Sequence, residues 1–359
     1  MTTAIALSRA GARCSIVEIN TDWRPAGVGI GLQSPPLRAL KALDLFKPIV
    51  DVSWPSPEIE MTRADGERVL MLHQHNVNDP GDPPFVTLSR MALHDALADR
   101  LREHDVEVRL GTTVDAFDER DGGVAVTLSD GTTEDFDLVV GADGVHSKVR
   151  SMILPGAPAP ALAGQVIWRL AARRPQTLNH YTIMVAGPHR IGLVPLSDDD
   201  LYLWMLDNTL PPERPSSDRL LALFQERMAS YGGSAPAIAE QATDPAQLDF
   251  RALYWLVVPP PWSTGRVLLI GDAAHTTTPH LAFGVGLAIE DAVVLADLVR
   301  DGVPAAQVGE RLAARRYERC RRVVDASLQL SRWEQEQGPP NPEAPRLIEA
   351  TFASLAQPI

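Results

Sequence analysis

Two segments of the chain combine an apolar run, a glycine and an aspartate in the same order. Residues 138–150 contain Gly141-Ala142-Asp143-Gly144, and residues 267–275 contain Gly271-Asp272. Ligands of open α/β sheets bind at the carboxyl ends of strands, where a glycine permits close approach to the backbone and a carboxylate accepts hydrogen bonds from sugar hydroxyls. The pattern therefore predicts that Asp143 and Asp272 belong to one ligand site. The alternative is that both are only turn formers, because Asp-Gly and Gly-Asp are common in turns.

A third glycine-containing segment, Gly284-Val285-Gly286, opens a strongly apolar stretch at residues 287–299. Its acidic residues Glu290 and Asp291 fall on one side, so we expect a buried helix in which both have structural roles. Free N–H groups at a helix start favour a phosphate or a polarised ring oxygen. The ligand site is therefore expected to extend to residues 284–286.

The first 20 residues predict the second half of a dinucleotide-binding unit. Residues 2–10 predict a helix that stops at Gly11, and residues 14–19 predict a short strand with Glu18 near its end. In such units an acid lies about 20 residues after a glycine-rich phosphate loop. No glycine precedes Gly11, so we expect the sequence to begin just after that loop.

Together these segments resemble the FAD-dependent aromatic hydroxylases, the single-component flavoprotein monooxygenases that include p-hydroxybenzoate and salicylate hydroxylases. The resemblance covers nearly the whole chain. It implies an α/β fold, with a Rossmann-like FAD-binding domain and an inserted mixed β-sheet substrate domain. The departure from the family is the missing N-terminal strand and Gly-x-Gly-x-x-Gly loop. The residues that carry the resemblance are Glu18, Arg90 in Leu88-Ser89-Arg90-Met91-Ala92-Leu93, residues 141–150, Gly271-Asp272-Ala273-Ala274-His275 and Ala288-Ile289-Glu290-Asp291-Ala292.

The resemblance also implies roles for individual residues. Glu18 is expected to bind the adenosine ribose, and Arg90 is expected to reach the pyrophosphate or ribityl side of FAD. Asp143 belongs to a block that serves both FAD and the nicotinamide cofactor. Asp272, beside Gly271, is expected to hold the ribityl chain. The residues expected to flank the isoalloxazine ring are Pro279, Gly284, Val285 and Gly286.

The reaction implied by the resemblance is an oxygen transfer. In this family NADPH or NADH reduces FAD, and oxygen then forms a flavin hydroperoxide that hydroxylates an electron-rich ring. We therefore expect an FAD-dependent monooxygenase that acts on a small aromatic or polycyclic substrate. Two alternatives stay open: an FAD-dependent reductase or dehydrogenase on the same fold, and a truncated, flavin-free binding protein.

The substrate face is expected to come from the strand-rich middle of the chain. Alternation puts Tyr202 and Trp204 on the same face of one strand, where they either line the cavity or, as the favoured alternative, form core. A phenolic substrate would profit from a base, and His180 or Tyr181 could act as this catalytic residue. His275 is more typical of a hydrogen-bonded support than of a base. The candidate side chains of the middle region are Trp168, Arg169, His180, Tyr181, Tyr202 and Trp204.

The chain is expected to divide into two domains and a tail. Residues 59–72 predict a hairpin that turns at Asp65-Gly66. Residues 307–333 predict a long, charged and exposed helix, and the proline-rich C-terminus predicts a loosely held tail. The expected segments are 1–56, 86–160 and 257–335 for the FAD-binding domain, 57–85 and 161–256 for the substrate domain, and 336–359 for the tail.

The composition disfavours several other classes of protein. The 359 residues carry a formal net charge of −13, and a nucleic-acid or anionic membrane partner needs a positive surface. The two cysteines, Cys14 and Cys320, form no disulfide framework, and neither a spanning apolar stretch nor a secretory signal is evident, so a cytoplasmic protein is expected. The histidines and cysteines show no metal-ligand spacing, so no metal is expected. The expected partners are a small aromatic substrate and oxygen.

Overall fold

Two neighbouring parallel strands carry the glycine–aspartate loops. The computed structural model describes residues 1–25, 27–185, 187–336 and 341–359. Strand β11 (Val139–Gly141) pairs in parallel with β18 (Val267–Leu269), and Gly141 lies opposite Leu269. Both loops therefore leave the same edge of one sheet, as the sequence predicts.

The parallel strands of this half of the molecule form two separate sheets. Strands β1 (Ser15–Glu18) and β7 (Glu107–Leu110) pair in parallel with each other. Strand β18 pairs with β11 and, antiparallel, with the short β17 (Ser263–Thr264). Within the described residues, no strand pairing joins the two sheets.

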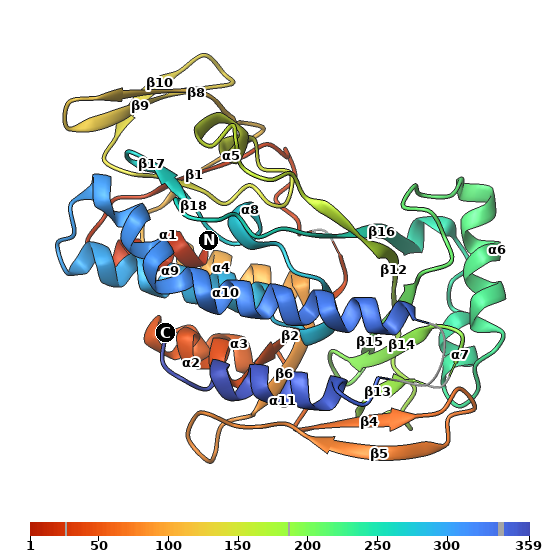
Figure 1. Cartoon of the computed structure of the whole chain (residues 1–359). Coiled ribbons are helices and arrows are strands. Elements are labelled where there is room, and N and C mark those ends of the chain that lie inside the picture. Colours follow the sequence, from red (N-terminus) through yellow and green to blue (C-terminus); the bar gives the residue numbers. More distant parts are fainter. Residues whose placement is uncertain (26, 186, 337–340) are drawn as a thin grey trace.

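Helices cover these sheets because their apolar faces need burial. Helix α9 (Gly284–Arg300) packs against α1 (Thr2–Arg9), against α2 (Ser34–Ala42) and along the long α10 (Ala305–Gln335), which crosses the molecule (Figure 1). Helix α4 (Arg90–Arg102) starts at Ser89, whose hydroxyl accepts a hydrogen bond from the Ala92 N–H at 3.0 Å. No helix in the described ranges is both long and apolar enough to cross a membrane.

A mixed seven-stranded sheet forms the other half of the molecule. It contains one parallel pairing, β13 with β4, and otherwise antiparallel pairs, in the order β16-β12-β15-β14-β13-β4-β5. Helices α6 (Ser217–Met228) and α7 (Ala235–Ala239) cover one face, where Trp168 packs on Phe224. The other face is turned toward the helices and loops of the first half. The strands are β4 (Glu58–Thr62), β5 (Arg68–His73), β12 (Ala161–Arg173), β13 (Tyr181–Met184), β14 (Arg190–Pro195), β15 (Asp200–Asp207) and β16 (Leu248–Trp255).

Short elements complete the fold. A sheet of β2, β6 and β3 precedes α4, and an antiparallel sheet of β8, β9 and β10 lies beyond α5 at the top of Figure 1. The bounds are β2 (Gly29–Gln33), β3 (Trp54–Pro55), β6 (Phe85–Ser89), β8 (Val114–Arg120), β9 (Gly123–Leu128), β10 (Thr133–Phe136), α3 (Phe46–Val50), α5 (Lys148–Ile153), α8 (Asp272–His275) and the 3-10 helices η1 (Pro245–Gln247) and η2 (Pro279–Leu281).

Two expectations about the C-terminal region are wrong. Helix α10 is not an exposed helix, because one face is buried, including the charged Arg316. The expected loose tail contains a further helix, α11 (Ala344–Leu355), which packs on α10 and buries Leu355 completely. Prolines suggested a tail, but Pro345 occupies the first turn of α11, where proline is compatible with a helix.

Candidate functional site

The second glycine–aspartate loop requires its glycine. Gly271 adopts φ +55° as the N-cap of α8, and a Cβ atom there would lie 3.2 Å from the Cβ atom of Ala288 on α9. Its N–H donates to Asp291 Oδ2 at 3.0 Å. Gly271 thus combines a left-handed backbone with a close approach to the neighbouring helix.

Asp272 presents an open carboxylate at this loop. The residue is exposed to solvent, yet protein surrounds it closely enough that desolvation raises the pKa of its carboxyl, against the opposing effects of His275 and Arg90. Within the described residues, no donor forms a hydrogen bond with this carboxylate. An accessible but partly desolvated acceptor of this kind suits the hydroxyl groups of a bound ligand.

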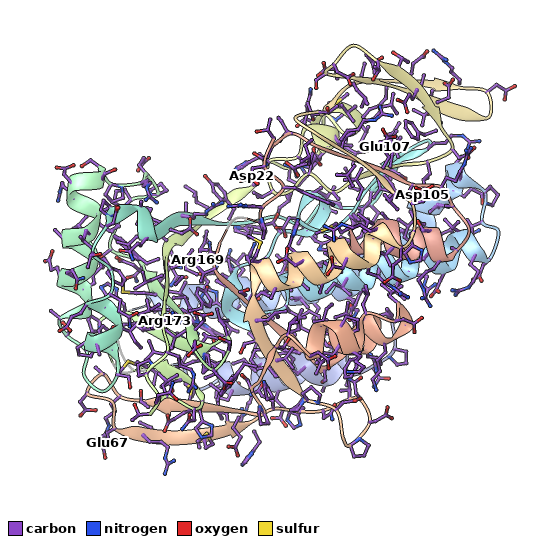
Figure 2. The ribbon with its side chains drawn as sticks, turned by 180° about the vertical axis from the view of Figure 1, so that it is seen from behind. Asp22, Glu67, Asp105, Glu107, Arg169 and Arg173 are labelled. Carbon is purple, nitrogen blue, oxygen red and sulfur yellow. The ribbon has the colours of Figure 1, made fainter. Side chains whose placement is uncertain are left out.

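Arg90 lies across from Asp272 at the start of α4. Its backbone N–H donates to Val28 O at 2.9 Å. A Cβ atom added at Gly27 would lie 3.1 Å from Arg90 Cδ, so Gly27 and Val28 lie close to the arginine. Desolvation and the neighbouring Arg169 lower the pKa of Arg90, whereas Tyr202 and Asp272 raise it. Figure 2 shows Arg169 beside the start of α4. Arg90 therefore interacts electrostatically with Asp272 and with two residues of the seven-stranded sheet, Arg169 and Tyr202.

The segment expected beside the isoalloxazine ring lies between α8 and α9. Pro279 is exposed in η2, and α9 begins at Gly284 after Phe283, a residue without a side-chain oxygen to cap the helix. Gly286 is buried, and a Cβ atom there would lie 2.9 Å from Pro36 Cγ on α2. A small residue at 286 is therefore required for helix packing. The role of Gly284, Val285 and Gly286 beside the ring stays a prediction.

A buried ionic cluster stabilises the second glycine–aspartate loop. The Asp291 carboxylate accepts hydrogen bonds from Gly271 N–H, from His275 Nε2 at 2.7 Å and from Arg316 Nε at 2.8 Å. Burial alone would raise the pKa of Asp291, but His275 and Arg316 hold it well below its ordinary value. Burial would lower the pKa of His275, yet Cys320 and Asp291 raise it well above its ordinary value. The interpretation of His275 and Asp291 as structural residues agrees with this geometry.

The same cluster contains a group with the composition of a metal site. Among the described residues, His275, Asp291 and Cys320 place possible ligand atoms within 4.8 Å of one another. Arg316, however, lies 2.8 Å from Asp291 and is completely buried beside it. Because the carboxylate already accepts from three donors, one of them a guanidinium, we assign the cluster a structural role.

The first glycine–aspartate loop uses its carboxylate internally. Asp143 accepts hydrogen bonds from Ser147 Oγ at 2.5 Å and from Val149 N–H at 2.9 Å, at the start of α5. Arg150 joins the two loops, donating to Ala273 O at 2.9 Å and to Val145 O at 2.8 Å. Asp143 thus stabilises its own turn; its expected contact with FAD stays a prediction. Sequence reasoning missed the bridging role of Arg150, whose only signal was its place at the end of the motif.

Glu18 lies at the carboxyl end of β1, as predicted. Its Oε1 accepts hydrogen bonds from Asn20 N–H at 2.9 Å and from Asn20 Nδ2 at 2.6 Å. These bonds orient the carboxylate, and its second oxygen accepts no hydrogen bond from the part of the chain that the structure describes. Its binding of a ribose stays a prediction.

The sheet presents aromatic side chains toward these loops. In the register of β12 with β15, Arg169 lies opposite Trp204 and Ala171 opposite Tyr202, so both aromatic residues share one face. This face is opposite to the one that packs on α6, where Trp168 is fully buried. Tyr202 lies against β2, where a Cβ atom added at Gly29 would be 2.5 Å from its ring. Tyr202 and Trp204 therefore lie between the sheet and the candidate site.

The structure separates the two candidate catalytic residues. Tyr181 lies on the same face as Tyr202, its hydroxyl accepts a hydrogen bond from Trp204 Nε1 at 3.2 Å, and burial raises its pKa to about 12. His180 is half-buried, and its Nδ1 lies 3.9 Å from Glu58 Oε2 on the neighbouring strand β4. His180 is therefore not brought to the site. Tyr181 is close to it, but as a protonated phenol and not as a base.

A buried polar network near Pro279 was missed by sequence reasoning. His280 Nε2 lies 3.1 Å from Glu334 Oε2, and Arg190 Nη1 donates to the same oxygen at 3.3 Å. The Arg190 guanidinium also stacks 5.7 Å from the centre of the Trp204 ring. Burial lowers the pKa of His280, against the opposing effect of Glu334. The network joins η2, the end of α10 and the aromatic face of the sheet. No local pattern marked Glu334, because it falls just beyond the expected helix of residues 307–333, which was itself expected to be exposed.

Comparison with known proteins identifies the family. A family model described as an FAD binding domain matches residues 1–327. The chain belongs to this FAD-binding family. The 3-amino-4-hydroxybenzoate 2-monooxygenase of Streptomyces platensis is 31% identical over 334 residues, which cover 89% of this chain and 81% of the relative. The FAD-dependent urate hydroxylase of Klebsiella oxytoca is 28% identical over 337 residues, which cover 90% of this chain and 85% of the relative.

A solved structure confirms the fold. Klebsiella pneumoniae HpxO complexed with FAD and uric acid superposes with a TM-score of 0.83 at 24% identity, covering 99% of this chain and 89% of that one. The predicted α/β fold with an FAD-binding part and a mixed sheet is therefore confirmed. So is the identification as a flavoprotein monooxygenase, an oxidoreductase that uses FAD. The open carboxylate of Asp272, the nearby Arg90 and the uncapped start of α9 fit this cofactor.

Proposed function

We propose that this protein uses NADPH or NADH and oxygen to hydroxylate a small aromatic or heteroaromatic ring. The observation that carries the proposal is the position of Asp272 beside Arg90, which interacts with Tyr202 of the sheet; among the described residues no donor bonds to the Asp272 carboxylate. The two relatives named above, which act on an aminohydroxybenzoate and on urate, support a ring-shaped, polar substrate.

The chain's own residues would hold the cofactor as follows. Asp272 would accept hydrogen bonds from sugar-alcohol hydroxyls, and Arg90 would neutralise phosphate charge. Glu18 would accept from a ribose, and the N–H groups at the start of α9 would face a polarised ring oxygen. When bound, FAD supplies the electron transfer and the oxygen activation that no side chain of this protein can provide.

The substrate would lie between the 276–286 segment and the aromatic face of the sheet. Tyr181 stays protonated at neutral pH because burial raises its pKa to about 12. Trp204 Nε1 donates to the Tyr181 hydroxyl, and no acceptor for the Tyr181 proton is found in the described ranges. Tyr181 can therefore donate a hydrogen bond to a ring oxygen of the substrate. Tyr202 and Trp204 would exclude water from this side of the ring.

The test is a measurement of coupling. Purified protein is expected to show the visible absorption of oxidised flavin and to oxidise NADPH or NADH faster when a suitable hydroxylated ring is added. With ¹⁸O₂, the product is expected to carry one labelled oxygen atom per nicotinamide consumed. Stimulated oxidation of the nicotinamide without label in the product would indicate a reductase instead. A colourless protein that binds no added FAD would contradict the proposal altogether.

A further inference from the structure

Glu334, near the end of α10, contacts both of the segments between which the substrate is proposed to lie. One is η2, where His280 follows Pro279, and the other is the aromatic face of the sheet, which carries Arg190. Glu334 Oε2 lies 3.1 Å from His280 Nε2 and 3.3 Å from Arg190 Nη1. Burial would raise the pKa of the Glu334 carboxyl, but His280 and Arg190 lower it, so the group is a carboxylate at neutral pH. One carboxylate oxygen thus connects η2 with the sheet.

The end of α10 is itself anchored on the sheet. Ser331 Oγ donates to Gln165 Oε1 at 2.6 Å, and Gln335 Nε2 donates to Ala163 O at 2.9 Å, both on β12. Figure 1 shows this end of α10 beside the strands of the sheet. The two bonds lie on either side of Glu334 in the sequence, so they fix the backbone from which its carboxylate extends.

The His280 imidazole is held from two sides. Its side chain is fully buried, and Nδ1 lies 3.0 Å from Thr278 Oγ1. The Thr278 hydroxyl can donate to Nδ1, which leaves the proton of a neutral imidazole on Nε2, the nitrogen that faces Glu334. Glu334 therefore offers this buried nitrogen an acceptor, and the contact holds η2 in place.

Arg190 belongs to the aromatic face of the sheet. Gly192, two residues further along β14, lies opposite Trp204, so Arg190 and Trp204 point to the same side. The Arg190 guanidinium lies 5.7 Å from the centre of the Trp204 ring, whose Nε1 donates to the Tyr181 hydroxyl at 3.2 Å. A Cβ atom added at Gly192 would overlap this ring, so the glycine lets the indole lie across β14. Arg190 therefore helps to fix Trp204 and, through it, Tyr181.

We propose that Glu334 is a positioning residue for oxygen transfer, which holds η2 against the aromatic face of the sheet so that the substrate ring keeps one orientation. Glu334 acts through His280 and Arg190 and needs no contact with the substrate. The inference rests on the proposed function, because it assumes that the substrate lies between these two segments. When the substrate is misplaced, the two electrons of each nicotinamide reduce one O₂ to hydrogen peroxide. When it is well placed, one oxygen atom enters the ring and the other leaves as water.

The first experiment measures coupling. Hydroxylated product and hydrogen peroxide are determined per nicotinamide consumed by the FAD-loaded protein, with a ring that the wild type hydroxylates. In Glu334→Ala we expect the product ratio to fall about tenfold or more, because a displacement of about 1 Å can slow a reaction about 100-fold. Glu336→Ala is the matched control, since Glu336 is exposed two positions further along the chain. Equal coupling in the two alanine variants would overturn the proposal.

A second pair of variants separates positioning by charge from a role in packing. Glu334→Gln keeps the size of the side chain without its charge, and Glu334→Asp keeps the charge on a shorter side chain. Because the pair with Arg190 needs the charge, Glu334→Asp is expected to retain more coupling than Glu334→Gln. The opposite order would show that only the volume of the side chain matters and would contradict the proposal.

The third measurement needs no turnover. Hydrogen exchange followed by mass spectrometry on the substrate-free, FAD-loaded protein reports the local opening of residues 276–286. We expect exchange in this segment to be about tenfold faster in Glu334→Ala than in the wild type, and unchanged in Glu336→Ala. Equal exchange in all three proteins would overturn the inference. Faster exchange in Glu334→Ala, in a protein whose wild type transfers no oxygen, would refute the proposed function and still show that Glu334 holds η2.

Discussion

The two glycine–aspartate loops follow neighbouring strands, but their carboxylates are used differently. Asp143 accepts hydrogen bonds from Ser147 and Val149 and so stabilises its own turn and the start of α5. Asp272 has no such donor in the described residues, because its loop is held from below by Asp291. When a buried carboxylate supports the loop, the carboxylate on the loop stays available for a ligand.

The electrostatic environments of Asp272 on the second loop and of Asp291, which supports this loop from α9, are also opposite. Desolvation raises the pKa of Asp272, whereas His275 and Arg316 hold the pKa of the buried Asp291 well below its ordinary value. The same residue type, 19 positions apart, thus acts as a support in one case and as an open acceptor in the other. Three substitutions and one pH titration test these differences between the carboxylates.

Removing the support is expected to have the largest effect. Asp291→Asn leaves Arg316 and His275 buried without their counter-charge, and breaking such a pair costs about 3–5 kcal/mol of unfolding free energy. Denaturant unfolding of the FAD-free protein measures this loss. Asp297→Asn on the same helix, where Asp297 pairs with Arg300 near the surface, is the control and should change stability little. Equal stability of the two variants would show that the cluster is not a support.

Removing the open carboxylate is expected to affect binding and not folding. Asp272→Ala loses at least one charge-assisted hydrogen bond to the cofactor, so FAD affinity should fall about tenfold or more. Stability of the FAD-free protein should stay equal or rise slightly, since a desolvated carboxylate is removed. Calorimetric titration with FAD and denaturant unfolding provide the two measurements. A variant that binds FAD as tightly as wild type would refute the role of Asp272.

Acidification is expected to weaken FAD binding through the same residue. Hydroxyl donors favour the ionised carboxylate, so affinity should be full above the raised pKa of Asp272 and fall as the pH drops through it. The FAD-free fold responds with the opposite sign, because a raised folded-state pKa makes this residue's contribution to stability more favourable at lower pH. FAD titrations across the acidic range on wild type and Asp272→Asn measure the effect. An identical pH dependence in both proteins would assign it to another group.

Removing the first carboxylate is expected to have the smallest effect. Asp143→Ala removes the acceptor of the Ser147 hydroxyl and of the Val149 N–H at the start of α5, and should lower the unfolding free energy by about 1 kcal/mol. FAD affinity should fall less than in Asp272→Ala, because the Asp143 oxygens already accept hydrogen bonds within the protein. Comparing FAD titrations of the two alanine variants decides the point. A larger loss of affinity in Asp143→Ala would reverse the comparison.

Local patterns predicted the elements near the site because their cause is local. Residues 284–300 are apolar nearly all round and form the buried α9, and Tyr202 and Trp204 share a face because side chains alternate along any strand. The same reasoning failed for α10 and α11. Charges on α10 suggested exposure, but Arg316 is neutralised by acids on another helix, which no pattern within α10 can show.

From the sequence alone one can place the glycines and aspartates at strand ends, since backbone geometry and turn chemistry depend on neighbours in the chain. The tertiary structure alone decides which carboxylate is open. Arg150 reaches from one loop to Ala273 in the other, and Asp291 reaches from α9 to Gly271, over separations of 123 and 20 residues. The tertiary structure likewise unites His280, Glu334 and Arg190 and leaves His180 outside. The physical reason is that desolvation and hydrogen bonding depend on all atoms around a group, most of which come from distant parts of the chain.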